Sequence, residues 1–254
     1  MKVRVLLDSC VLIAASVHMV SDDIGVELKH LFFDESMNLV GLLKKHIAKR
    51  VGIVTSTVES ETRLVLEEAA RQEILSRSLD EFKLLSVVVN ACEYRLDTIL
   101  NYLLREPIDP LERDKYYVRV CEIYDYWIDY GRELDLSETA SAKAEVVPKE
   151  YKKAAFRIYR QQDYEENRQA IHLAKSPIDH VDKLILSEAT YIYNLYKQTE
   201  GKDIKVFLAS TDTHFSPTRG GLVSRVVTDA VLAKLGVTCD WPNDIAKAVR
   251  ELVD

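Results

Sequence analysis

The sequence predicts an α/β fold with a central parallel sheet, because three short apolar runs occur with helical patterns between them. The runs lie at residues 3–7, 52–54 and 206–209 of the 254-residue chain. Continuous apolar runs of this length are typical of strands that are buried on both faces. Strands that alternate with helices favour a parallel, doubly wound sheet.

The composition indicates a folded chain outside the membrane. Hydrophobic residues make up 47% of the sequence, and 8 glycines and 6 prolines are too few for a disordered or low-complexity chain. No apolar run reaches the ~20 residues that a membrane span requires. The N-terminal apolar stretch follows only Lys2 and Arg4 and is interrupted by Asp8, which makes it a poor signal peptide. We therefore expect a cytoplasmic protein with no membrane partner.

The cysteines and the net charge limit the kinds of site that the chain can form. The cysteines form no CxxC pair or Cys/His cluster, so we expect no zinc site and thiols that are reduced and mostly buried. They are Cys10, Cys92, Cys121 and Cys239. The net charge of −7 argues against a generally basic nucleic-acid-binding surface, but it is compatible with a local basic groove. It also leaves room for a site made of carboxylates.

The middle of the chain, residues 63–176, predicts a mostly helical insertion. It is dense in Leu, Glu, Arg, Lys and Tyr, and its one strand-like run is residues 84–89. It is too long for a βα crossover. Breaks that predict four or five helices fall at Ser78, residues 107–110, Gly131 and Val147-Pro148. We therefore expect a first core part (1–62), the insertion (63–176) and a second core part (177–254).

Two acidic residues follow predicted strands. Asp8 ends the first strand, and Asp212 follows the third strand in the sequence Ser210-Thr211-Asp212. In open parallel sheets the site lies beyond the carboxyl ends of the strands, so the two acids are a candidate pair. The alternative for each is a role as N-cap of the following helix.

A third acid, Glu61, follows the second predicted strand. Ser56 and Glu59 have capping-box spacing, which gives Glu59 a structural role. Glu61 instead shares a helical stripe that we expect to face the sheet. The other members of the stripe are Val58, Leu64, Val65 and Ala69. A buried carboxylate must be paired or metal-bound, whereas a half-exposed acid or a salt bridge is the alternative.

A fourth acid, Asp182, precedes the third strand. Ser176 as N-cap and Pro177 at the first helical position explain Asp179 in the first turn. Asp182 has no such explanation, because it lies on an otherwise apolar stripe, and the same alternatives as for Glu61 apply. The stripe consists of Ile178, Asp182, Ile185, Ala189 and Ile192.

All four acids are predicted at one rim of the sheet, where their charges need compensation. Two carboxylates ~4 Å apart repel by about 4 kcal/mol at an effective dielectric constant of 20. Four acids in one pocket require protonation or cations. Mg²⁺ or Mn²⁺, which prefer oxygen ligands, are the expected cofactors.

The pieces around these acids resemble the PIN-domain family of metal-dependent nucleases. They are LLDSCVLIAA around Asp8, TSTVESE ending at Glu61, HVDKLILSEA at Asp182 and STDTHF at Asp212. The tail LGVTCDWPNDI is similar to the short last strand of the family and the segment after it. The resemblance covers residues 1–62 and 177–254 and implies a three-layer fold around the parallel sheet.

The resemblance also implies an activity, the hydrolysis of RNA phosphodiesters. Metal ions held by Asp8, Glu61, Asp182 and Asp212 lower the pKa of a bound water and stabilise the leaving oxygen. Such an endoribonuclease needs no side-chain nucleophile. An antitoxin or other protein partner and a homodimer stay open, as do toxin, RNA-processing and defence roles.

The sequence departs from the family pattern at some positions. Cys10 stands where many members carry Asn or Ser, so we expect the polar contact that orients Asp8 to be missing or weaker. Ser210 keeps the usual Ser or Thr two residues before Asp212. Glu59 replaces Glu61 as the ligand if the helix register differs. The insertion has no counterpart in small family members.

Basic side chains are candidates for binding the RNA backbone. The substrate-binding candidates are Ser210, Lys152, Lys153, Arg157 and Arg219. Phosphate contacts are one interpretation of the basic residues, and a solvated helix face is the other.

Two further functions compete with the nuclease. One is a catalytically inactive PIN-like scaffold that binds RNA or a protein through the insertion. The other is a phosphotransfer domain with Asp8 as covalent acceptor. The latter is disfavoured because no second acid follows two residues after Asp8.

Overall fold

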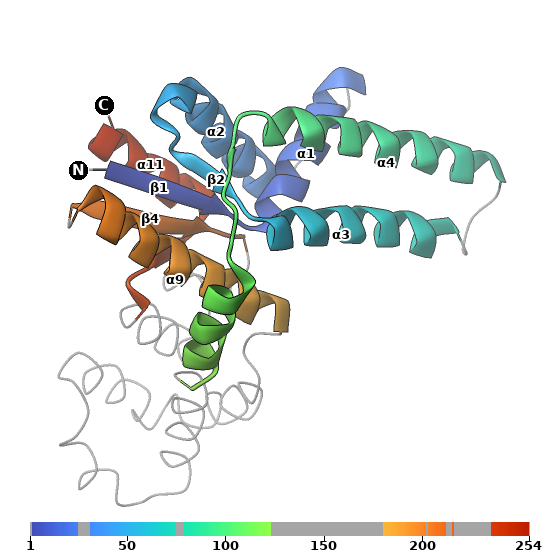
Figure 1. The fold of residues 1–254 in the computed structure, drawn as a ribbon. Coiled ribbons are helices and arrows are strands. Elements are labelled where there is room, and N and C mark those ends of the chain that lie inside the picture. Colours follow the sequence, from blue (N-terminus) through green and yellow to red (C-terminus); the bar gives the residue numbers. More distant parts are fainter. Residues whose placement is uncertain are drawn as a thin grey trace, which may run out of the picture.

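The structure, a computed structural model, describes residues 2–24, 31–74, 79–122, 180–201, 203–211, 215 and 235–253. These residues form one all-parallel, five-stranded sheet with the strand order β3-β2-β1-β4-β5 (Figure 1). The strands are β1 (Lys2–Leu7), β2 (Gly52–Val54), β3 (Leu104–Arg105), β4 (Ile204–Ala209) and β5 (Thr238–Asp240). The predicted α/β class with a central parallel sheet is therefore confirmed.

The three predicted strands are present, and each boundary lies within two residues of its predicted position. β1 pairs with β4 along its whole length, from Lys2 opposite Ile204 to Leu7 opposite Ala209. β5 lies within residues 235–245, the tail segment in which a short last strand was expected. β3 was not predicted, because a two-residue strand is too short to show a pattern.

Helices cover both faces of the sheet (Figure 1). The helices are α1 (Ser9–Ile24), α2 (Leu31–Lys45), α3 (Ser56–Ile74), α4 (Leu79–Leu100), α9 (His180–Glu200) and α11 (Pro242–Val253), with a 3-10 turn η1 (Ile47–Lys49) before β2. Residues 110–122 are also helical. α1, α2 and α11 lie on one face, and α9 packs against β4 on the other. α3 and α4 form an antiparallel pair that projects beyond the sheet.

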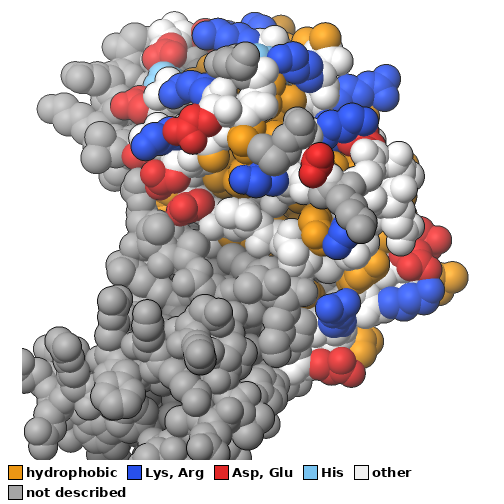
Figure 2. All heavy atoms as spheres, turned by 90° about the vertical axis from the view of Figure 1, so that its left-hand side faces the viewer, with side chains coloured by type: hydrophobic (Ala, Val, Ile, Leu, Met, Phe, Trp, Pro, Cys, Tyr) orange, Lys and Arg blue, Asp and Glu red, His pale blue; other side chains and the backbone are white. Residues whose placement is uncertain are grey.

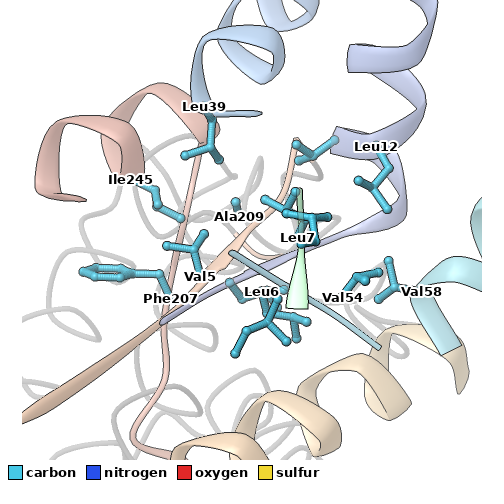
Figure 3. Packing of buried hydrophobic residues seen from close by; sticks show 14 of the residues in the cluster. Val5, Leu6, Leu7, Leu12, Leu39, Val54, Val58, Phe207, Ala209 and Ile245 are labelled. Carbon is cyan, nitrogen blue, oxygen red and sulfur yellow. The ribbon is translucent and has the colours of Figure 1, made fainter. Parts of the chain in front are cut away.

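Alternate residues of the central strands pack into these two layers. Val5 lies with Leu39 of α2 and Ile245 of α11 on one side of the sheet, as Figure 3 shows. Leu6 and Leu7 of β1 are completely buried. Full burial of a leucine side chain stabilises the fold by about 1.5–3 kcal/mol, so the two apolar layers hold β1 in place.

The predicted insertion contributes to the same sheet. Residues 84–89, the run that looked strand-like in the sequence, lie within the helix α4 and form no strand. α4 is helical because its apolar residues Cys92, Leu96 and Ile99 recur at helical spacing and are buried. β3 pairs with β2, and α4 packs on α1 and α3. Residues 123–176 of the predicted insertion lie outside the described residues.

The face that α3 buries differs from the predicted stripe. Val58 is buried as expected, but the next buried residues are Thr62 and Leu66. Leu64 and Val65 are exposed, so the predicted stripe is wrong beyond the first turn. Val58, Thr62 and Leu66, which are spaced four residues apart, pack inward instead. The predicted stripe was wrong because it included Leu64 and Val65 on account of their apolar side chains.

The buried face of α9 agrees with the predicted stripe. Ile185, Ala189 and Ile192 are completely buried, and Asp182 lies half-buried one turn before them. Residues 176–179, which include the predicted cap, lie outside the described residues.

The sequence also predicted that the four cysteines are reduced and mostly buried and that no segment spans a membrane. All four thiols are free, and Cys92 and Cys239 are buried whereas Cys10 and Cys121 are partly exposed. Among the described residues, no helix has the length and apolar character needed to cross a bilayer.

Candidate active site at the switch point

The strand order reverses on either side of β1, which has β2 as one neighbour and β4 as the other. In open parallel sheets, ligands bind beyond the carboxyl ends of the strands at such a switch point. Asp8, Thr55 and Ser210 follow β1, β2 and β4, and the strand register places them side by side. We call these three residues the polar row.

The polar row is buried at the end of strands whose other buried residues, apart from Arg4 of β1, are apolar. The exposed fractions are 4% for Asp8 and 1% each for Thr55 and Ser210. Burial of polar groups is unfavourable unless each finds a partner. A concentration of buried polar groups at this edge therefore indicates a site rather than ordinary packing.

Asp8 is held by hydrogen bonds to both of its carboxylate oxygens. Its Oδ1 accepts from the backbone N–H of Ser9 at 2.7 Å, and its Oδ2 accepts from the Ser210 hydroxyl at 2.6 Å. The Asp8 carbonyl also accepts the first hydrogen bond of α1, from Val11 at 3.1 Å. Asp8 thus stands at the start of α1, and its side chain also bonds across to Ser210, which follows β4.

Cys10 supplies a third contact to the Asp8 carboxylate. Its Sγ lies 3.1 Å from Asp8 Oδ2 and accepts the backbone N–H of Thr211 at 3.1 Å. Burial, together with the negative charge of Asp8, raises the pKa of the Cys10 thiol well above its usual range, so the thiol is neutral and donates to the carboxylate. The orienting contact was expected to be missing or weaker. The structure shows that it is present and is made by a thiol, which is a weaker donor than a hydroxyl or amide.

The start of α3 is capped differently from the prediction. Thr55, not Ser56, is the N-cap, because its Oγ1 accepts the backbone N–H of Val58 at 3.4 Å. The Glu59 carboxylate does not close a capping box. It pairs with Arg63 at 3.0 Å and with Arg105 at 3.4 Å. These ion pairs occupy Glu59, and Glu61 lies half-buried half a turn further along α3.

Asp182 lies in the first turn of α9 and is half-buried. The other end of α9 reaches the amino end of β1, where Glu200 pairs with Arg4 at 2.8 Å. The start of α9, with Asp182, is therefore directed toward the carboxyl ends of the strands. His180 at this start is hydrogen-bonded through Nδ1 to the Tyr117 hydroxyl at 2.7 Å, which joins α9 to the helix at 110–122.

The structure describes some of the predicted site residues and not others. It brings Asp8 and Ser210 into direct contact. Asp212, Lys152, Lys153, Arg157 and Arg219 lie outside the described residues. Within the described part of the chain, no group of three or more His, Cys, Asp or Glu side chains is placed to hold a metal ion. The site of four carboxylates therefore stays a prediction.

Two acidic residues near this edge were missed at the level of sequence. Glu188 of α9 is completely buried and accepts a hydrogen bond from the Thr57 hydroxyl at 2.5 Å. Asp240 ends β5, and its backbone carbonyl accepts the N–H of Ser210 at 3.2 Å. The sequence contained an indication of both residues. Glu188 interrupts an apolar helix face, and Asp240 stands at the end of a short strand, much as Asp8 directly follows one.

A hollow of about 460 Å³ lies at the opposite, amino end of the sheet. Its charged lining residues are Lys2, Arg4, Lys49 and Glu200. Arg4 pairs with Glu200, and Lys49 Nζ donates to the Val253 carbonyl at 2.8 Å. Figure 2, which faces this end, shows basic, acidic and apolar side chains intermixed. Three basic side chains face a single carboxylate in this lining, so the hollow is a weaker candidate for a metal site than the polar row.

Comparisons of the chain with protein-family models, with curated proteins and with solved structures found no match.

Proposed function

We propose that this protein is a PIN-like, metal-dependent endoribonuclease that hydrolyses RNA phosphodiesters. Asp8, Glu61, Asp182 and Asp212 would hold Mg²⁺ or Mn²⁺. The observation that carries the proposal is the buried, doubly anchored carboxylate of Asp8 at the switch point of the sheet. A carboxylate fixed in this way is suited to bind a cation, because its orientation is set before the ligand arrives.

The donor set fits a hard divalent cation. All four side chains supply carboxylate oxygens, which Mg²⁺ and Mn²⁺ prefer to nitrogen or sulfur. Glu61 and Asp182 are half-buried rather than fully exposed, and each lies near the amino end of its helix. The neutral thiol of Cys10 adds no negative charge to this set.

The helix termini support an anionic substrate. α1 and α3 begin directly after β1 and β2, so their amino ends lie at the same edge as the polar row. The amino end of a helix carries a partial positive charge, which favours phosphate. The N–H groups of Ser9 and Val58 already bind Asp8 and Thr55, so in this proposal it is the partial charge of the two helix ends that would favour an RNA backbone.

The chain's own residues orient the reacting groups. Ser210 and Cys10 hold Asp8 Oδ2, which prevents the carboxylate from rotating away from the edge of the sheet. When bound, the metal ions supply a water of lowered pKa and stabilise the leaving oxygen. In this proposal α3 would supply Glu61 and α9 would supply Asp182 to the same metal site.

Replacement of single carboxylates tests the proposal. Asp8→Asn and Asp182→Asn are expected to abolish Mn²⁺-dependent cleavage of single-stranded RNA while the circular dichroism spectrum stays unchanged, since Asn keeps the shape but loses the charge. Asp34→Asn on α2, an exposed acid that pairs with His18, is the matched control and should cleave normally. Unchanged cleavage by either site variant contradicts the nuclease. Absence of cleavage by the wild-type protein favours the PIN-like scaffold that binds RNA or a protein such as an antitoxin.

A further inference from the structure

Glu188 is unusual among the acidic residues of this protein. Within the described ranges, only Asp8 and Glu188 are acidic and buried, and Glu188 is 0% exposed. Its Oε1 accepts the Thr57 hydroxyl, whereas its Oε2 is buried without a hydrogen-bond partner among the described residues. Burial of an incompletely paired carboxyl group is unfavourable. An apolar side chain at this position would pack at lower cost.

The polar neighbours of Glu188 on α9 behave differently. Ser187 Oγ donates to the Lys183 carbonyl at 2.6 Å, and Thr190 Oγ1 donates to the Leu186 carbonyl at 2.7 Å. Both hydroxyls are therefore satisfied within their own helix. Glu188 instead reaches across to another element, the first turn of α3. Its side chain connects two helices, which the adjacent buried hydroxyls do not.

The connected helices both carry predicted metal ligands. Thr57 and Glu61 are four residues apart on α3 and therefore lie on the same side of that helix. Asp182 lies in the first turn of α9, the helix that carries Glu188. Movement of α3 relative to α9 would change the separation of the Glu61 and Asp182 carboxylates.

We propose that Glu188 is a positioning residue, which fixes the start of α3 against α9 through Thr57 and so sets the relative position of Glu61 and Asp182. This inference rests on the proposed function, because it assigns Glu188 an effect on the same metal site. Glu188 itself is not a ligand in this assignment.

The electrostatic surroundings of Glu188 agree with this role. Burial raises the pKa of the Glu188 carboxyl, while hydrogen bonding to Thr55 and Thr57 and the positive charge of Arg113 act in the opposite direction. The hydrogen bonds from the two threonines and the charge of Arg113 therefore offset part of the cost of burying this carboxyl group.

The test compares metal affinity with stability in three variants. Glu188→Gln keeps an acceptor oxygen for Thr57, Glu188→Leu removes it, and Thr57→Val removes the donor from the other helix. We expect Mn²⁺ affinity, measured by isothermal titration calorimetry, to stay near the wild-type value in Glu188→Gln. It should fall roughly tenfold in each of the other two, as is typical when a group that orients a metal ligand is lost. The double variant Glu188→Leu/Thr57→Val should bind no more weakly than Glu188→Leu, because both changes remove one interaction.

The outcomes separate this inference from the proposed function. If wild-type protein does not bind Mn²⁺, the metal site itself is wrong and the inference fails with it. If wild-type protein binds Mn²⁺ and Thr57→Val binds it equally well, the proposed metal site stands but Glu188 is not a positioning residue. The same conclusion follows if the variants lose melting temperature without losing affinity. The Mn²⁺ affinity of Thr57→Val still tests the role of Glu188 if Glu188→Leu does not fold, because Thr57 is only half-buried.

Discussion

At the residue scale, Cys10 shows how a thiol replaces the Asn or Ser that the family resemblance leads one to expect. The thiol reaches Asp8 Oδ2 on one side and the Thr211 N–H on the other, so it links the ends of β1 and β4. Because its pKa is raised, it acts as a neutral donor and not as a nucleophile.

Cys10 substitutions test this role directly. Cys10→Ser keeps a donor to Asp8, and its single-turnover RNA cleavage rate should lie within about threefold of the wild-type rate. Cys10→Ala should reduce the rate about tenfold, because a hydrogen bond to a charged group contributes roughly 1.5–3 kcal/mol. Cleavage by Cys10→Ala at the wild-type rate would show that the thiol does not orient Asp8.

Glu188 gives a prediction for stability as a function of pH. Its raised pKa means that the folded protein binds the proton more tightly than the unfolded chain, in which the pKa is near the usual 4.5. The contribution of Glu188 to stability is therefore full below pH 4.5 and is lost as the pH rises through the folded-state pKa. Glu188→Gln removes this dependence. The melting temperature of the variant minus that of the wild type should therefore rise between pH 4 and pH 8, and parallel curves would contradict the assignment.

Sequence patterns identified these residues unevenly. Asp8 was predictable because it ends an apolar run, and the α9 stripe around Asp182 was predictable because its apolar members recur at helical spacing. The partners of Asp8 across the sheet were not predictable, because Ser210 lies about two hundred positions away in the chain. Glu188 was not predicted, because no residue near it in the sequence indicates that Thr57 lies against it.

At the scale of elements, α3 shows why the inward face of a helix is hard to assign from composition. Its buried row is Val58, Thr62 and Leu66, whereas the predicted stripe continued through Leu64 and Val65. A buried threonine whose hydroxyl bonds to the Val58 carbonyl at 2.7 Å substitutes for an apolar residue. The boundary with β2 also moved, because Thr55 rather than Ser56 caps the helix.

A pair of leucine substitutions checks the orientation of α3. Leu66 is 5% exposed and Leu64 is 64% exposed. Leu66→Ala should lower the free energy of unfolding by about 2–4 kcal/mol, because it leaves a cavity. Leu64→Ala should change it by less than about 0.5 kcal/mol. Urea denaturation measures both, and a larger effect at Leu64 would restore the stripe predicted from sequence.

β3 and α4 illustrate a second limit at this scale. β3 has two residues, and its assignment depends on pairing with β2 rather than on any local pattern. Residues 84–89 read as a strand because of consecutive β-branched side chains, yet they lie in a helix that packs on α1 and α3. Tertiary packing overrides local propensity in both cases.

At the scale of the whole molecule, the two ends of the sheet have different characters. The carboxyl end carries the polar row, where Asp8 is bonded to Ser210 and Cys10. The amino end carries the hollow, whose lining holds three basic side chains and one carboxylate (Figure 2). The apolar runs predicted the sheet itself, but the order of its strands, and hence the switch point, depends on long-range pairing.

A crystal structure of the protein with Mn²⁺ tests most directly whether the carboxylates share a metal ion at the switch point. Manganese should give an anomalous peak within about 2–2.5 Å of an Asp8 carboxylate oxygen, with Glu61, Asp182 and Asp212 completing the ligand set. A structure without manganese there, in which Asp8, Glu61, Asp182 and Asp212 lie too far apart to share an ion, would contradict the proposed metal site.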